Sequence, residues 1–333
     1  MVSGEPVPRR VTSADIAREC GVSRTTVSYV LNDTPHQKIS DATRERVLSS
    51  ATRLGYTPSA AARTLRAGRS DIVLCLLPDW PIGPEVARTL QYLSTALAGH
   101  GLTFLTHPRS AGEFLPAHLW RAIGPAAVLG LDRFTKQENV EMRSAGIGVV
   151  SVLMADDGPH QGELAQQGIG RLQAEHLLDA GHRSIGYAWP TDERLLGFAE
   201  PRLAGVRAGC ATRGAAEPMT LELTGSDDGA RVAVRAWRAA GVTAVCAYND
   251  EVAFQLLTAA RAENLHVPGD LAVIGVDDIP LARHAAPPLT SVATDQQAVA
   301  EYTAEAIARA LDGGAAPRPP GPGVITVVVR ESA

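Results

Sequence analysis

Lysine and cysteine are both scarce in this chain, and their scarcity excludes several kinds of site. Only Lys38 and Lys136 are present among 333 residues, and neither follows a glycine-rich loop, which excludes a Walker A phosphate-binding loop. The four cysteines are scattered, with no C-x-x-C pair and no histidine at zinc-ligand spacing. We therefore predict reduced, mostly buried thiols, no metal site and no cofactor.

Sequence motifs of common enzyme classes are missing as well. The chain has no G-x-S-x-G and no H-E-x-x-H, and the pairs Gly146/Gly148 and Gly168/Gly170 lack the third glycine of a dinucleotide fingerprint. These absences predict a protein that is not an enzyme and has no catalytic residues. No apolar run reaches the length of a membrane span, and the segment VSGEPVPRR is too polar for a signal peptide. We expect a cytoplasmic protein with no membrane partner.

Charge is distributed unevenly along the chain. The formal net charge is −5, yet residues 1–70 hold 11 Lys and Arg against 6 Asp and Glu. The remainder holds 20 basic against 30 acidic residues. A small basic module on an acidic body predicts that only the N-terminal part approaches a polyanion such as DNA.

Two short helices joined by a tight turn are predicted at the start of the basic module. Thr12 and Asp15 fit the pattern of a capping box, and apolar residues follow at helical spacing. Gly21 permits a sharp turn, and Ser23 is a favourable N-cap for the second helix. An apolar face on that second helix is formed by Val27, Val30 and Leu31.

The opposite face of the second helix carries side chains that can bind a partner. Arg24 lies in its first turn, and Thr25 and Tyr29 point away from the apolar face. A third helix is predicted from a cap at Ser40 to a stop at Gly55. Together the three helices match a helix-turn-helix, whose second helix enters the major groove of DNA. An ordinary three-helix bundle is the alternative interpretation.

The segment GYTPSAAARTLRAGRS, residues 55–70, predicts a hinge. Pro58 breaks the chain, and Ser59 can cap a helix of about nine residues, which is too short to be stable alone in water. Its side chains are small except for three arginines and Leu65. That composition suits a minor-groove element with leucine as a wedge and arginine on phosphates. We expect this segment to be disordered without DNA and helical on DNA.

Beyond residue 70, short apolar runs alternate with helical patterns over about 260 residues. Such alternation predicts an α/β fold with parallel sheets covered by helices, and its length suits two lobes. The predicted strands are Ile72–Leu77, Leu102–Thr106, Ala126–Leu131, Ile147–Val152, Ser184–Ala188, Ala244–Tyr248, Leu271–Val276 and Val324–Val329. The predicted helices are Glu85–Gly99, Gly168–Ala180, Pro201–Arg213, Asp228–Ala239, Glu251–Glu263 and Asp295–Leu311.

Three motifs of the N-terminal module, in order, resemble the headpiece and hinge of the lactose-repressor (LacI) family. They are VTSADIARECGVSRTTVSYVLN, ISDATRERV and GYTPSAAARTLRAGRS. The resemblance implies operator DNA as a partner, base reading by Arg24, Thr25 and Tyr29, and Leu65 as the wedge. Ser59 and Tyr29 depart from the Asn and Arg that many members carry. The full set of DNA-contacting residues predicted in this way is Thr12, Ser23, Arg24, Thr25, Thr26, Ser28, Tyr29, Asn32, Ser59, Ala62, Arg63, Leu65 and Arg66.

The rest of the chain resembles the same family's sensor domain, which is similar to two-lobed periplasmic sugar-binding proteins. The supporting motifs include LQAEHLLDAGHRSIGY, AYNDEVAFQLL, LAVIGVDDIPLA and VVVRES. In open α/β sheets, ligands bind beyond the carboxyl ends of strands. By strand position and by resemblance, the effector contacts are predicted at Asp79, Trp80, Arg202, Asn249, Asp250 and Asp277.

Four of the predicted effector residues also have a purely structural alternative. Asn249 and Asp277 suit a helix cap or a turn, Arg202 suits an inter-lobe salt bridge, and Trp80 suits packing. The family often carries an acid that helps bind polyols where this chain reads AQQGIGR, residues 165–171. The predicted effector is therefore a small polar, hydroxyl-bearing metabolite, sugar or sugar-like.

These observations predict a transcriptional repressor that binds a pseudo-palindromic operator as a homodimer. Its predicted domains are a DNA-binding domain at 1–58, a hinge at 59–70 and a two-lobed domain for effector binding and dimerisation at 71–333. Two other functions stay open at this point. A binding protein without DNA function would use the sensor domain alone, and a catalytic sugar-processing protein would convert what it binds.

Overall fold

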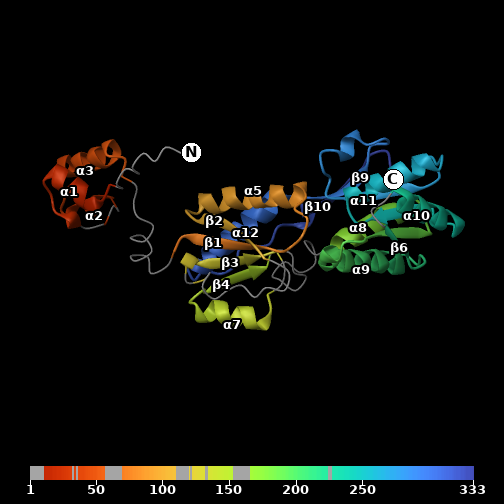
Figure 1. The fold of residues 1–333 in the computed structure, drawn as a ribbon, viewed down its shortest axis with the longest axis horizontal. Helices are drawn as coiled ribbons and strands as arrows, with labels where there is room; N and C mark the ends of the chain where they lie inside the picture. Colours follow the sequence, from red (N-terminus) through yellow and green to blue (C-terminus); the bar gives the residue numbers. More distant parts are fainter. Residues whose placement is uncertain are drawn as a thin grey trace, which may run out of the picture. The chain divides into compact units, whose positions relative to one another are not determined.

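The structure, a computed structural model, divides into two compact units, residues 1–70 and 71–333. It describes residues 11–31, 34, 37–56, 70–109, 120, 122–131, 134–152, 166–223 and 227–333. Figure 1 shows the first unit as a cluster of helices and the second as an α/β body with two lobes.

The first unit, called the headpiece below, is built on three helices: α1 (Ser13–Cys20), α2 (Arg24–Leu31) and α3 (Asp41–Arg53). The predicted turn between α1 and α2 is confirmed, because Gly21 adopts a left-handed φ of 64°. Ile16, Val27 and Val47 are completely buried and bring one residue from each helix to a common core. These contacts supply the packing that helices of this length need to be stable.

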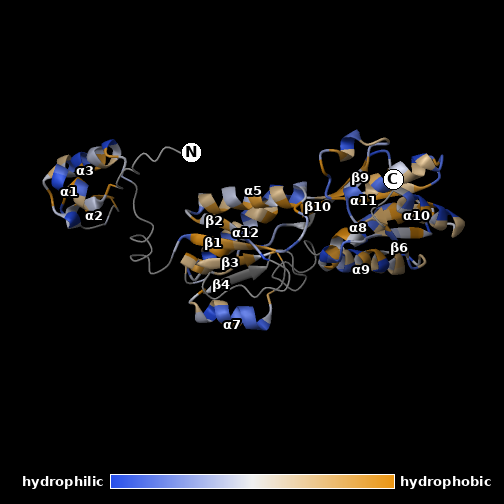
Figure 2. Ribbon diagram, viewed as in Figure 1, coloured by the Kyte–Doolittle hydropathy of each residue, from blue (hydrophilic) through white to orange (hydrophobic). Residues whose placement is uncertain are grey.

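The lobe that follows the headpiece, called the N-lobe, contains a four-stranded parallel sheet in the order β2-β1-β3-β4. Alternate residues of β1 face opposite sides, as strand geometry requires. Val73 and Cys75 pack with helices α5 and α12, whereas Leu74 and Leu76 pack on the side of Met142 in α7. Figure 2 shows β1 and β3 as hydrophobic strands and α7 as a mainly hydrophilic helix. The N-lobe elements are β1 (Ile72–Leu77), α5 (Pro84–Gly99), β2 (Thr103–Pro108), β3 (Ala127–Gly130), α7 (Lys136–Ser144), β4 (Val149–Val152) and α12 (Gln296–Leu311).

The second lobe, called the C-lobe, contains a six-stranded sheet in the order β10-β9-β8-β7-β5-β6. All neighbouring strands are parallel except β10 against β9. One face packs on α8 and α9 through Tyr187 and Cys246, and the other packs around Trp237. The C-lobe elements are α8 (Gln166–Asp179), β5 (Ile185–Pro190), η1 (Glu193–Leu195), α9 (Leu196–Thr212), β6 (Met219–Leu223), α10 (Asp227–Ala239), β7 (Ala244–Ala247), α11 (Asp250–Ala262), β8 (Ala272–Val276), η2 (Ala282–His284), β9 (Thr290–Thr294), η3 (Pro322–Val324) and β10 (Ile325–Val328).

The predicted fold class, a helical headpiece followed by a two-lobed α/β body with mostly parallel sheets, is confirmed. Strands β6 and β9 and helix α7 were not predicted. Helix α9 begins at Leu196 rather than at Pro201, because the 3-10 turn η1, capped by Asp192, leads directly into it. Pro201 therefore lies inside the helix.

Candidate functional site

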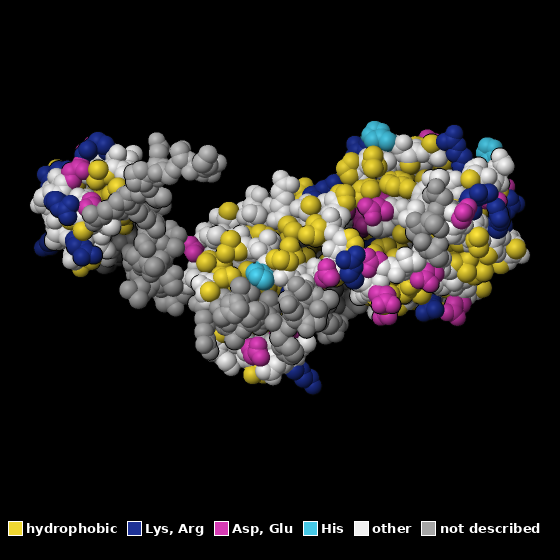
Figure 3. Space-filling view, in the orientation of Figure 1, with side chains coloured by type: hydrophobic (Ala, Val, Ile, Leu, Met, Phe, Trp, Pro, Cys, Tyr) yellow, Lys and Arg dark blue, Asp and Glu magenta, His cyan; other side chains and the backbone are white. Residues whose placement is uncertain are grey.

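The exposed side of α2 carries the residues predicted to read bases. Arg24 and Thr25, in the first turn, are exposed, and Tyr29 is half-buried one turn further along. Val27 and Val30 are buried against the other two helices. The apolar face of α2 thus fixes the helix in the headpiece and leaves its opposite face toward solvent. Figure 3 shows Lys and Arg side chains on the visible surface of this unit.

Two of the other predicted DNA contacts, Thr12 and Ser23, cap the headpiece helices. The Ser23 hydroxyl accepts a hydrogen bond from the Thr26 backbone N–H at 3.0 Å and lies 2.8 Å from the Thr26 hydroxyl. The Thr12 backbone N–H donates to an Asp15 carboxylate oxygen at 2.9 Å, as the predicted capping box requires. Such caps fix the N-terminal ends of α1 and α2.

The remaining predicted DNA contacts are not caps. Ser28 is half-buried on α2. The other predicted contacts lie outside the described residues: Asn32, Ser59, Ala62, Arg63, Leu65 and Arg66.

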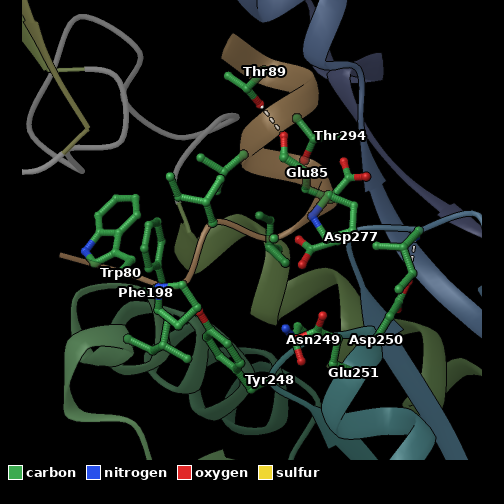
Figure 4. Close-up of a pocket in the computed structure, with 18 of the residues that line it drawn as sticks. Trp80, Glu85, Thr89, Phe198, Tyr248, Asn249, Asp250, Glu251, Asp277 and Thr294 are labelled. Carbon is green, nitrogen blue, oxygen red and sulfur yellow. Dashed lines mark hydrogen bonds between the residues drawn. The ribbon is translucent and has the colours of Figure 1, made fainter. Parts of the chain in front are cut away.

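A cavity of about 400 Å³ lies between the two lobes of the body. Its N-lobe wall includes the segment 80–86 together with Thr89 and Gln296. The C-lobe wall includes residues from α8, α9 and the loops that follow β7 and β8. Figure 4 shows aromatic side chains, Trp80 and Phe198, at one side of the cavity and acidic side chains at the other. The cavity is therefore amphipathic, and its volume is in the range of sites for small molecules.

Arg202, on α9, is the one basic side chain among those that line this cavity in the described parts of the chain. It is 5% exposed, and its Nε donates to the Gln166 side-chain oxygen at 2.7 Å. Its Nη1 donates to the Tyr248 carbonyl oxygen at 2.7 Å, and its guanidinium carbon lies 4.9 Å from the centre of the Tyr248 ring. Both short hydrogen bonds go to neutral groups. The charge of the guanidinium therefore has no tightly bonded counter-ion among these contacts.

Asp277, in the loop after β8, is the nearest acid to Arg202. An oxygen of its carboxylate lies 3.6 Å from Arg202 Nη2, and the side chain is 26% exposed. Burial raises the pKa of Asp277, and the Arg202 charge opposes that rise. At 3.6 Å the pair is an ion pair but not a hydrogen bond, so both groups keep hydrogen-bonding capacity for a ligand. Both residues belong to the C-lobe, so this pair is not the inter-lobe bridge considered as an alternative.

Asn249 and Asp250 follow β7 and begin α11. The Asn249 side-chain oxygen accepts from the Val252 backbone N–H at 2.9 Å and caps the helix. Asn249 also lines the cavity, so the helix-cap alternative and the predicted location both describe it. Its amide nitrogen can donate to a ligand. Asp250 is completely buried, and both of its carboxylate oxygens are occupied within the protein.

Asp79 and Trp80 follow β1 and reach the C-lobe. A carboxylate oxygen of Asp79 lies 3.6 Å from Arg194 Nη1. The Trp80 ring meets the Phe198 ring edge-on, with ring centroids 4.4 Å apart and an interplanar angle of 72°. Trp80 thus both packs, as the structural alternative required, and lines the cavity. Both contacts join the lobes, but Asp79 and Arg194 are not among the residues that line the cavity.

Several residues of the cavity were missed by sequence reasoning. Glu85, at the start of α5, accepts a hydrogen bond from the Gln296 side chain and lies 3.2 Å from Arg88. Burial raises the pKa of Glu85 to about 7. Gln166, Phe198 and Tyr248 were also missed. Their position in the sequence could have identified them, because each lies beside the end of a predicted strand or on a helix next to such an end.

No helix in the described ranges combines the length and apolar character that crossing a membrane requires. No three His, Cys, Asp or Glu side chains in those ranges are grouped closely enough to hold a metal ion.

Two family models match the chain. The model for bacterial regulatory proteins of the lacI family matches residues 12–59, and the periplasmic binding protein-like domain matches residues 174–333. The transcriptional regulator CelR of Thermobifida fusca is 31% identical over 310 residues, which cover 85% of this chain and 87% of that protein. The chain belongs to the lacI family. It is a DNA-binding transcriptional regulator with a periplasmic-binding-protein-like domain.

Other relatives and solved structures agree with this family membership. GalS of Salmonella typhimurium is 31% identical over 318 residues, covering 92% of this chain and 90% of that regulator. A CelR–cellobiose complex has a TM-score of 0.63 and 26% identity, covering 97% of this chain and 100% of that chain. A structure of the lac repressor dimer bound to operator and the anti-inducer ONPF has a TM-score of 0.77 and 21% identity. The match covers 97% of this chain and 99% of that chain, and it shows that the two share a fold. The two relatives are named as transcriptional regulators.

Proposed function

We propose that this LacI-family regulator is a repressor whose operator affinity is controlled by a hydroxyl-bearing metabolite, sugar or sugar-like, bound between the lobes of its body. The observation that carries the proposal is the cavity of about 400 Å³ lined by both lobes. Its polar end offers donors on Arg202 and Asn249 and an acceptor on Asp277. A polyhydroxylated ligand matches such a mixture, because each hydroxyl both donates and accepts.

The aromatic end of the cavity supports a ligand with an apolar ring face. Trp80 and Phe198 form an edge-to-face pair there, and Ile82 lines the same cavity while 57% exposed. A sugar ring carries C–H groups on its faces and hydroxyls at its edge, which suits a cavity that is apolar at one end and polar at the other. The CelR complex similar to this structure contains cellobiose. We therefore take cellobiose as the first probe.

The effector proposal is tested by thermal unfolding of the full chain with cellobiose, other sugars, polyols and nucleobases. A ligand at 100 times its Kd adds about 2.7 kcal/mol to the stability of the state that it binds. We expect at least one sugar or polyol to raise the melting temperature and to change binding to a labelled operator duplex. If every compound of this panel leaves both quantities unchanged, the assignment of the cavity as a sugar-type sensor fails.

The proposed DNA-reading face is tested by Arg24→Ala and Tyr29→Ala. We expect each to lower the preference for the selected operator over random duplex by about 1–3 kcal/mol, because a side chain on a base edge distinguishes sequences. Arg18→Ala is the matched control, since Arg18 is exposed on α1 and paired with Asp15. It should change both affinities by similar factors. An unchanged ratio in Arg24→Ala, measured by competition binding, would show that a different face reads the bases.

We further propose a homodimer on a pseudo-palindromic operator, because one headpiece reads only a few base pairs. A groove of about 340 Å³ on the C-lobe, lined by apolar residues together with Thr258, Arg261 and His284, supports this proposal. Leu281, which lines it, is 62% exposed, and its neighbours Phe254, Leu257 and Ala285 add apolar surface. A second copy covering this groove would bury that surface.

A further inference from the structure

The loop that carries Asp277 has an unfavourable backbone. Directly after β8, Asp277 and Asp278 adopt φ values of 100° and 46°, in a region that residues other than glycine rarely occupy. Two such residues in succession cost free energy unless their surroundings fix them. Asp277 faces the cavity from this loop, as Figure 4 shows. The contacts that hold the loop therefore decide where the Asp277 carboxylate lies.

Three consecutive backbone N–H groups hold this loop. Asp277 N–H donates to the Val292 carbonyl oxygen at 2.8 Å, and Asp278 N–H donates to the Ser291 hydroxyl at 3.0 Å. Ile279 N–H donates to Asp250 Oδ2 at 2.8 Å. Two of the three acceptors belong to β9, and the third is the first residue of α11. The backbone of 277–279 is thus fixed along its whole length.

Asp250 connects two of these three contacts. Its Oδ1 accepts from the Ser291 hydroxyl at 2.6 Å, while its Oδ2 holds Ile279. Gly275 lies against the carboxylate, and a Cβ at that position would overlap Asp250 Oδ1. Burial raises the pKa of Asp250 to about 7 although both hydrogen bonds lower it. Burying an acid completely costs free energy unless hydrogen bonds compensate for the lost water. Both Asp250 oxygens have such a bond.

We propose that Asp250 is a positioning residue: it fixes the 277–279 loop so that Asp277 is presented to the effector, and it does not bind the effector itself. This inference rests on the proposed function of the cavity and changes the predicted role of Asp250 from contact to support. It also assigns Ser291 a part, because that hydroxyl donates to Asp250 and accepts from Asp278 at the same time.

The test compares Asp250→Ala, Asp250→Asn and Ser291→Ala in the full chain. We expect Asp250→Ala to accelerate amide exchange at 277–279 about 10-fold or more while the amides of α11 and β8 stay protected. It should raise the Kd for cellobiose about 10-fold, the effect of losing a hydrogen bond to a charged group, and leave operator affinity within about 3-fold. Asp250→Asn should recover part of both effects, because an amide oxygen can still accept from Ile279.

Asp270→Ala is the matched control, since Asp270 also accepts from a backbone N–H of the C-lobe, that of His266 at 2.7 Å, outside the cavity. It should leave both readouts at wild-type values. Wild-type exchange at 277–279 in Asp250→Ala would overturn the proposal, as would loss of protection across all of α11. If Asp250→Ala does not fold, Ser291→Ala provides the same comparison. If wild type fails to bind cellobiose, the choice of ligand is at fault, and the exchange rates alone decide the role of Asp250.

Discussion

Asp277→Ala is expected to abolish the effector response while operator binding without effector stays within a few-fold of wild type. The carboxylate lies 3.6 Å from Arg202, too far for a hydrogen bond between them, and it is partly exposed to the cavity. It is thus available to accept from a ligand hydroxyl. A hydrogen bond to a charged group contributes about 1.5–3 kcal/mol, so we expect affinity for cellobiose to fall about 10- to 100-fold.

A second variant separates this effect from backbone strain. Alanine at the φ of 100° found at Asp277 is more strained than aspartate, whereas asparagine tolerates that region well. Asp277→Asn should therefore keep the stability of wild type, keep one acceptor and lose only part of the affinity. Calorimetric titration with cellobiose, beside operator binding of the same samples, supplies the comparison. Wild-type effector affinity in Asp277→Ala would mean that the effector binds elsewhere.

The two inter-lobe contacts indicate how effector binding would change the conformation of the body. Asp79 with Arg194, and Trp80 with Phe198, join the lobes in this conformation. A ligand shifts a conformational equilibrium only by its difference in affinity between the two states. A ligand held by Asp277 of the C-lobe and by the segment 80–86 of the N-lobe has that difference, because opening the lobes separates it from one of the two. Ligand-free and ligand-bound chains would then differ in lobe closure.

Apolar runs and helical apolar patterns were sufficient to predict most strands and helices of the body. Strands such as β1, with the sequence IVLCLL, are buried on both faces and appear as continuous apolar runs. Strand β9 was missed because its sequence is TSVAT, yet Thr290 and Ser291 are completely buried. The Thr290 hydroxyl accepts from the Arg330 backbone N–H at 2.9 Å, and the Ser291 hydroxyl donates to Asp250 at 2.6 Å. Hydrophobicity alone does not detect a buried strand whose buried polar side chains are hydrogen-bonded within the protein.

The candidate site was predictable to the extent that it depends on strand ends. Arg202, Asn249 and Asp277 lie far apart in the sequence, and the structure brings all three to one cavity. The support role of Asp250 was not predictable, because its partners Ser291 and Ile279 lie 41 and 29 residues away and are revealed only by tertiary contacts. Glu85 was missed for a similar reason, since its partner Gln296 is 211 residues distant.

Helices α8 and α9 approach each other so closely that only glycine fits at their contact. A Cβ at Gly205 would overlap the Gln167 carbonyl oxygen, and a Cβ at Gly170 would overlap the Arg202 carbonyl oxygen. Both obstacles are backbone atoms, which cannot rotate away as a side chain can. The same approach places Gln166 of α8 within 2.7 Å of Arg202 Nε of α9. The glycines therefore support both the stability of the C-lobe and the geometry of the cavity.

Gly205→Ala is accordingly expected to lower the free energy of unfolding of the C-lobe by about 3 kcal/mol, the upper end of the usual cost of overpacking, because the two helices must separate. Gly197→Ala is the matched control in the same helix, where a Cβ meets nothing within 4 Å. It should stabilise the chain by up to about 1 kcal/mol, since alanine is the better helix former.

Urea unfolding followed by tryptophan fluorescence measures the stability of both variants, and it reports on the C-lobe through the completely buried Trp237. Equal unfolding midpoints for the two variants would show that α8 and α9 are not in such close contact in solution, and Gln166 would then not be held against Arg202 in the way described.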